Sequence, residues 1–194
     1  MWDMHVYKWM IKRGRHRKKR IIKVLSPKLF NNRELGYIPC YEPKNIIGRR
    51  LETILYNLTE LPLHFYIKIK FKIVDVDGDT AYTEFDGLEY FREYIRSLFQ
   101  RGTSYIDIYR DLMVEDMGYR IFIDIFTPKR INTSRKRAVR SLIHRYIDSL
   151  DYDSHDKFLT DLIYGVIDNE VVKLSRKIYP IRWGGVTKVK KLHK

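Results

Sequence analysis

The sequence predicts an α+β fold in which an antiparallel, barrel-like β core carries packed helices and basic N- and C-terminal extensions. Apolar residues recur with period two through much of residues 21–127, and the period changes to 3.6 beyond Pro128. The chain has 194 residues, 44% of them apolar, which suffices for one domain with a sizeable core. We therefore expect a single α+β domain over 21–181, with a β-rich core at 21–127 and a helical part at 132–179.

The two ends of the chain are expected to lie outside this domain. Residues 1–20 mix aromatic residues with a basic run and lack strand alternation, which predicts an extension that orders on a partner. Its aromatic rings either stack on bases, dock on a neighbouring protein or fold back onto the core. Residues 182–194 predict a basic C-terminal tail, in which Gly184 and Gly185 are expected to form a flexible joint before a basic strand or tail.

The first half of the β core is predicted from alternation and from turn residues. A short strand at 21–25 ends before a proline, which lacks the N–H that a sheet needs. Residues 31–48 are rich in Asn, Gly and Pro and predict an irregular connection, and a second strand follows at 51–58. Every odd position of 63–73 is apolar, which predicts a strand with one buried face.

A hairpin and a helix are predicted next. The Asp-Gly pair at 77–78 predicts a turn into a partner strand at 80–85. Asp86 has Glu89 at the spacing of a capping box, and apolar residues then recur at helical spacing. We therefore expect a helix over 87–101.

Alternation predicts a second hairpin, with strands at 106–115 and 119–127. Its acidic residues Asp107, Asp111, Glu115 and Asp124 could be imagined as the metal ligands of a nuclease. However, period two places the acidic residues of the first strand simply on its solvent-facing side. We therefore favour a structural interpretation of these carboxylates.

Three helices are predicted beyond Pro128. Apolar residues at a spacing of 3.6 form one stripe of a helix over 134–150. Two shorter helices follow, the first between Ser154 and Gly165 and the second ended by Pro180.

The distribution of charge indicates a polyanionic partner. The chain has a formal net charge of +14 and a pI near 9.7. Residues 12–20, 129–140 and 182–194 contain no acidic residue and hold 18 of the 38 Lys and Arg residues, whereas the other 160 positions hold 20 basic and 24 acidic residues. A solvated basic face would explain any one segment, but three of them favour phosphate binding and make nucleic acid the expected partner.

Other classes of protein are disfavoured by what the sequence contains. The single cysteine, Cys40, excludes disulfide scaffolds and cysteine-only zinc sites and fits a reducing cytosol. No uncharged run exceeds seven residues, so we expect no membrane span, and the N-terminus lacks the apolar core of a secretory signal. The six histidines are scattered without chelating spacing, and we expect neither a metal nor another cofactor.

Short motifs run in a fixed order through the chain. They are Ser-Pro-Lys-Leu-Phe (26–30), Ile-Gly-Arg (47–49), Gly-Asp-Thr-Ala-Tyr-Thr-Glu-Phe (78–85), Tyr-Ile-Arg-Ser-Leu (94–98), Arg101 with Thr103-Ser104 and Ile106-Asp107, Gly-Tyr-Arg (118–120), Phe126-Thr127 with Lys129-Arg130, and Lys-Ile-Tyr-Pro (177–180). Together they resemble the archaeal and eukaryotic small-subunit ribosomal protein family S-three-A-e.

This resemblance implies a structural rather than catalytic protein. Members of the family bind rRNA on the platform of the small subunit, near the mRNA exit and the 3′ end of the rRNA. The implied partners are small-subunit rRNA and neighbouring small-subunit ribosomal proteins, with mRNA near the exit site and initiation factors as further candidates. The implied location is the cytoplasmic ribosome, with no membrane involved.

The acid-free segments supply the candidate RNA-binding residues. They are Arg13, Arg15, Arg17, Lys18, Lys19, Arg20, Lys129, Arg130, Arg135, Lys136, Arg137, Arg140, Arg182, Lys188, Lys190 and Lys191. Two alternatives stay open: a free-standing RNA-binding regulator or chaperone, and a metal-dependent nuclease that uses Asp107, Asp111 and Asp124.

Overall fold

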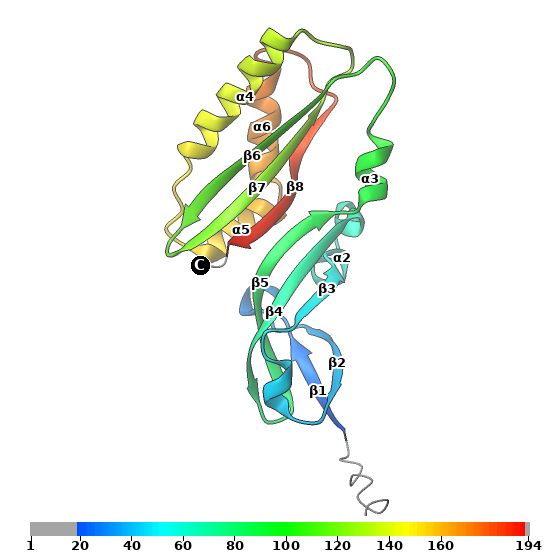
Figure 1. The fold of residues 1–194 in the computed structure, drawn as a ribbon, viewed down its shortest axis with the longest axis vertical. Helices are drawn as coiled ribbons and strands as arrows, with labels where there is room; N and C mark the ends of the chain where they lie inside the picture. Colours follow the sequence, from blue (N-terminus) through cyan, green and yellow to red (C-terminus); the bar gives the residue numbers. More distant parts are fainter. Residues whose placement is uncertain (1–18, 193–194) are drawn as a thin grey trace, which may run out of the picture.

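A computed structural model describes residues 19–192 and confirms the α+β class (Figure 1). The strands in this part of the chain are β1 (Arg20–Leu25), β2 (Glu34–Cys40), β3 (Arg50–Ile54), β4 (Ile67–Asp77), β5 (Thr80–Tyr90), β6 (Tyr105–Val114), β7 (Met117–Phe126) and β8 (Trp183–Leu192). The helices are α2 (Tyr56–Thr59), α3 (Arg92–Ser97), α4 (Thr133–Asp148), α5 (His155–Ile163) and α6 (Val166–Arg176), with 3-10 turns at η1 (Lys28–Phe30), η2 (Pro43–Ile46) and η3 (Pro62–Tyr66).

The eight strands form one open sheet, so the expected barrel-like shape fits only loosely. Strand β5 joins its two halves, because one edge of β5 pairs first with β1 and then with β8, while the other edge pairs with β4. The strand order is β2-β1-β5-β8-β7-β6, with β3 and β4 on the other side of β5. All pairs are antiparallel except β1 with β5.

The junction between β5 and β8 is short and close. It consists of the pairs Gly87 with Lys190, Leu88 with Val189, and Glu89 with Lys188. A Cβ atom at Gly87 would lie 2.6 Å from the carbonyl oxygen of Val189, closer than two such atoms can approach. The junction therefore requires glycine at this position.

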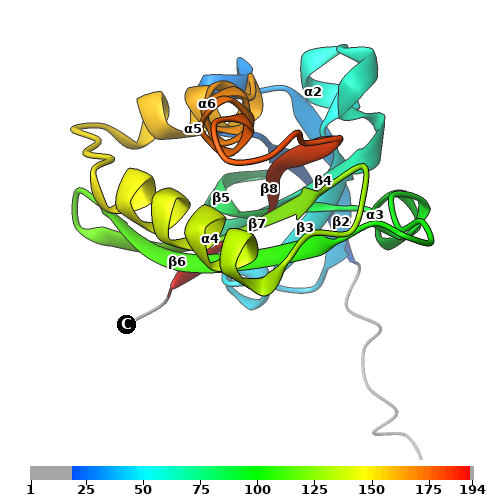
Figure 2. The ribbon, with the colours of Figure 1, turned by 90° about the horizontal axis from the view of Figure 1, so that it is seen from above.

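Helices α4, α5 and α6 cover one face of β6, β7 and β8 (Figure 2). Alternate strand residues such as Ile108 and Ile123 point to this layer and are buried with Val139 of α4 and Phe158 of α5. A smaller core around Ile73 lies among β1, β2, β4 and β5. No helix of the described residues is long and apolar enough to cross a membrane.

The two predicted hairpins and the three predicted C-terminal helices are confirmed. Asp77 pairs with Thr80 across the first turn. Val114 pairs with Met117 across the second turn, two residues earlier than the predicted start of its return strand. Helices α4, α5 and α6 lie where the 3.6-residue period placed them.

The predicted helix over 87–101 is wrong, because β5 continues to Tyr90 and α3 is short. Phe85 pairs with Phe71, while the next pair is Gly87 with Lys70, so the strand bulges between them. The bulge lets Phe85 and Leu88 enter the same core, although they are three residues apart. That spacing imitates the period of a helix.

Three further predictions in the first half are wrong in part. Residues 31–48 are not wholly irregular, because β2 forms within them and pairs with β1. The strand predicted at 63–73 begins only at Ile67, since Pro62 starts the 3-10 turn η3, in which period two does not apply. Leu63 is consequently 82% exposed and His64 is buried. The strand predicted at 51–58 ends at Ile54, where α2 follows.

The C-terminal segment expected as a tail is instead strand β8, in the middle of the sheet. Its apolar residues Val186 and Val189 are buried, which gives the segment a place in the core despite its charge. Gly185 is not a flexible joint, because a Cβ atom there would lie 2.9 Å from the carboxyl carbon of Asp168. The close contact with Asp168 therefore requires a residue without a side chain at position 185.

Candidate nucleic-acid interface

The segment at the start of helix α4 lies at the surface, where Lys129, Arg130, Arg135 and Arg137 are exposed. Val139, Ile143 and Ile147 bury one stripe of the helix, which turns the remaining residues outward. The first turn contains no acidic residue, and Asn132 at the N-cap makes no side-chain hydrogen bond to it. Positive side chains there lie beside the positive end of the helix dipole, which is unfavourable without a bound anion.

Most cations of this segment lack an internal partner. Arg135 lies over the ring of Tyr179, 5.4 Å from its centroid. Of the other cations of this segment, Lys129, Arg130, Lys136 and Arg137 make no side-chain hydrogen bond, ion pair or ring contact within residues 19–192. They leave four positive groups available to an anion. We call Lys129, Arg130, Arg135, Lys136 and Arg137 the α4 basic cluster.

Arg140, further along α4, is engaged by the protein itself. Its Nη2 donates to Oδ1 of Asp107 at 2.7 Å, and its Nε donates to the Asp107 carbonyl oxygen at 3.1 Å. The hydrogen bond from Arg140 lowers the pKa of Asp107. Arg140 therefore anchors α4 to the edge strand β6, and its charge is largely neutralised.

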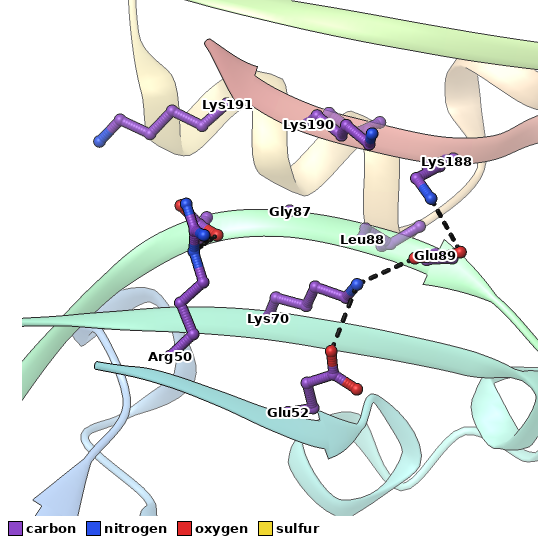
Figure 3. A pocket seen from close by; sticks show the side chains of 11 residues that line it. Arg50, Glu52, Lys70, Gly87, Leu88, Glu89, Lys188, Lys190 and Lys191 are labelled. Carbon is purple, nitrogen blue, oxygen red and sulfur yellow. Dashed lines mark hydrogen bonds and ion pairs between the residues drawn. The ribbon is translucent and has the colours of Figure 1, made fainter. Parts of the chain in front are cut away.

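The lysines of β8 line a groove at the junction with β5 (Figure 3). Glu89 of β5 accepts a hydrogen bond of 2.9 Å from Lys188 of β8 and another of 2.9 Å from Lys70 of β4. Lys70 also lies 3.3 Å from Glu52 of β3. Burial favours a higher pKa for Glu89, but the two lysines outweigh it and lower the pKa to about 2.

The groove has a volume of about 480 Å³ and more cations than carboxylates along its walls. The charged residues that line it are Arg50, Lys70, Lys188, Lys190 and Lys191, with Glu52, Asp86 and Glu89. We call this feature the β8 groove. Its ion pairs hold the cationic side chains in place, so the groove is both structured and net positive.

The remaining predicted residues of this segment differ in their engagement. Lys191 pairs with Glu84 at 3.2 Å, and Arg182 donates to the carbonyl oxygen of Leu98. Lys190 is exposed, and its Nζ lies 6.0 Å from the ring centroid of Phe122. Sequence reasoning placed these residues in a tail, whereas they stabilise the sheet as well as presenting charge.

Of the predicted basic residues near the N-terminus, the structure describes Lys19 and Arg20. Lys19 and Arg20 are exposed at the start of β1, and Lys19 lies 5.5 Å from the ring centroid of Tyr41. Arg13, Arg15, Arg17 and Lys18 lie outside the described residues. In Figure 1 the N-terminal end of α4 is at the top of the molecule, whereas β1 and the junction of β5 with β8 lie further down.

The carboxylates considered for a nuclease are held by other side chains. Asp107 pairs with Arg140, Asp111 pairs with Arg120 at 2.6 Å, and Asp124 accepts a hydrogen bond of 2.9 Å from the Tyr105 hydroxyl. Burial raises the pKa of Asp124. In the part of the chain that the structure describes, no three His, Cys, Asp or Glu side chains form a potential metal site.

Sequence reasoning did not assign Arg50 and Lys70 to the interface. The sequence does contain a signal for Lys70, because Lys68, Lys70 and Lys72 occupy the polar positions of the alternating strand. Their proximity to the lysines of β8 depends on strand pairing between segments more than 100 residues apart in the sequence. Such pairing cannot be derived from the local pattern.

Comparisons with known proteins identify similar chains along most of the length. The model of the ribosomal S3Ae family matches residues 10–194. The small ribosomal subunit protein eS1 of Methanopyrus kandleri is 36% identical over 176 residues, which cover 87% of this chain and 83% of that protein. The protein of the same name from Desulfurococcus amylolyticus is 37% identical over 177 residues, covering 90% of this chain and 83% of that protein. The one from Saccharolobus islandicus is 34% identical over 172 residues.

Proposed function

The chain belongs to the ribosomal S3Ae family, and from this membership we propose that it is a structural protein of the small ribosomal subunit that binds rRNA. The family match confirms the resemblance drawn from the ordered motifs. The similar archaeal proteins are named as components of the small ribosomal subunit, which supports a structural role in translation.

The α4 basic cluster carries the proposal that the partner is rRNA. A first helical turn without acids, surrounded by cations that have no internal ion pair, is unfavourable for the free protein and favourable for a phosphate. Lys19, Arg20 and Lys190 are further exposed contacts. Arg140, Arg182, Lys188 and Lys191 would combine a phosphate contact with their internal bonds. We extend the proposal to Arg13, Arg15, Arg17 and Lys18 by their sequence pattern alone.

The finer location follows from the family resemblance. We propose the platform of the small subunit in the cytoplasm, near the mRNA exit and the 3′ end of the rRNA. Neighbouring small-subunit proteins would cover part of the surface, and mRNA and initiation factors are further candidate partners. We propose no catalytic activity, because the paired Asp107, Asp111 and Asp124 serve the fold.

Sedimentation tests the proposal with the full chain. The protein should migrate with small subunits and remain there after a high-salt wash. Lys136→Glu with Arg137→Glu should reduce its retention, whereas Lys44→Glu with Lys157→Glu, which makes the same charge change at exposed sites of η2 and α5, should not. Equal retention of both double variants would contradict the role of the α4 basic cluster.

Two outcomes would support the alternatives. Complete release of the wild-type protein by the salt wash would favour a free-standing regulator or chaperone. Cleavage of RNA in the presence of magnesium, abolished by Asp107→Asn, would favour a nuclease.

A further inference from the structure

The face of β6, β7 and β8 that lies opposite the helices carries a pair of aromatic rings. Tyr109 of β6 is 65% exposed and lies directly across from Phe122 of β7. The centroids of the two rings are 6.4 Å apart, and their planes are inclined by 35°. A solvent-facing side of an antiparallel sheet is normally polar, so this exposed aromatic pair indicates a binding surface.

The aromatic pair adjoins the β8 groove in the same sheet. Phe122 pairs with Lys188, and Lys188 in turn pairs with Glu89, so one row crosses β6, β7, β8 and β5. Lys190 extends from β8 to within 6.0 Å of the Phe122 ring centroid and also lines the groove. The rings and the cations are therefore neighbouring parts of one surface.

The charges of this surface suit a phosphate backbone. Of the acids near the rings, Asp107 and Asp111 form ion pairs with Arg140 and Arg120, and Asp124 accepts a hydrogen bond from the Tyr105 hydroxyl. In the groove, Lys188 donates to Glu89 but has three N–H donors, so it can bind a phosphate oxygen without losing that ion pair. Exposed Lys190 has no carboxylate partner within residues 19–192.

We propose that this face binds a single-stranded RNA segment, with its phosphates in the β8 groove and neighbouring bases stacked on Tyr109 and Phe122. Aromatic rings on a sheet beside a positive groove are a common way to hold unpaired nucleotides, because every base offers a flat face for stacking. A duplex cannot use the rings, since its bases are already stacked. The inference goes beyond the proposed contact at the α4 basic cluster, which needs only phosphates and lies elsewhere in the fold.

Binding of a labelled octauridine to the full chain tests this proposal. Tyr109→Ala should weaken binding about ten-fold, and Tyr109→Phe should retain it, because stacking requires the ring and not the hydroxyl. Tyr164→Ala is the matched control, since Tyr164 is 64% exposed but lies at the end of α5. Phe122→Leu should weaken binding while preserving apolar bulk, and Lys190→Gln should lower the salt dependence.

The design separates this proposal from the proposed function. Tyr109→Ala should leave the affinity for a hairpin duplex unchanged, whereas Lys136→Glu with Arg137→Glu should weaken duplex binding. Equal octauridine affinity for wild type, Tyr109→Ala and Phe122→Leu would overturn the single-strand site, whatever the α4 variant does. If the aromatic variants still remained on small subunits after the high-salt wash, the proposed function would nevertheless be supported.

Ultraviolet crosslinking in intact small subunits, with and without bound mRNA, identifies the source of the strand. A crosslink to the β6–β7 hairpin without mRNA assigns it to rRNA, and a crosslink that requires mRNA assigns it to mRNA. Either supports the proposal. Protection of this face by another ribosomal protein, with no RNA crosslink, would overturn it.

Discussion

Asp168 shows how one side chain can join two elements at an energetic penalty. It lies on α6, and its Oδ1 accepts a hydrogen bond of 2.7 Å from the backbone N–H of Val186 on β8. Burial raises the pKa of this carboxyl to about 6 from its ordinary value of 3.8, and the bond from Val186 offsets only part of that effect. Between these two values the folded protein binds more protons than the unfolded chain, so this group makes the fold less stable as the pH rises.

Asp168→Asn should therefore stabilise the protein at pH 7, because it removes the buried charge while its amide oxygen can still accept from Val186. The free energy of unfolding should rise by up to about 3 kcal/mol, because this is the penalty that corresponds to raising the carboxyl pKa from its ordinary value. Thermal melts at pH 7 and pH 4.5 would measure it, and the advantage over wild type should shrink at the lower pH. Asp151→Asn, at an exposed site, is the control. An equal difference at both pH values would contradict the assignment to Asp168.

In strand β4, apolar and basic residues alternate, so that one face contributes to the core and the other carries positive charge. Ile69, Phe71 and Ile73 are completely buried, whereas the intervening lysines face the side that carries the β8 groove. Phe71→Asp should prevent cooperative unfolding or lower the stability by several kcal/mol, because it buries an unpaired charge. Lys72→Asp, one residue away, should be much milder. Chemical denaturation of both variants checks this, and similar midpoints would show that the facing of β4 is wrong.

Helix α4 is an element whose charge opposes its own stability. Lys136→Glu with Arg137→Glu should leave the free protein as stable as wild type or slightly more stable, since each cation near the helix N-terminus is unfavourable by about 0.3–1 kcal/mol. The same variant should bind rRNA more weakly and with a flatter salt dependence, because two phosphate contacts are lost. Melting temperature and affinity across a salt series provide both measurements. A marked loss of stability would mean that these residues serve the fold rather than RNA.

At the scale of the whole molecule, β8 holds the two halves of the sheet together. It pairs with β5 over three residue pairs and with β7 along most of its length, and Val186 and Val189 are buried. Truncation after Ile181 should therefore abolish the cooperative melt, because it exposes this core and leaves unpaired edges on β5 and β7. Deletion of residues 1–18 should preserve the melt, because β1 begins at Arg20 and keeps all of its pairing with β2. Calorimetry of both truncations tests this contrast, and a cooperative transition in the C-terminal truncation would contradict it.

The sequence by itself determined the class of the fold, most of its elements and the family. The two hairpins and the helices with a 3.6-residue stripe were predicted correctly, because their signals lie within a few residues of one another. The localised positive charge and the ordered motifs could likewise be recognised from the sequence alone. These properties depend on local pattern or on composition.

Only the tertiary structure decided which charges meet and which glycines are constrained. Glu89 has the spacing of a helix cap, yet a bulge in β5 places it between Lys70 and Lys188, which come from strands far apart in the sequence. The basic segment after Ile181 has the composition of a tail, yet pairing on both edges and the burial of Val186 and Val189 make it a central strand. The physical reason is the same in both cases. Strand pairing is non-local, so a residue's partners depend on the register between distant segments, which local periodicity does not encode.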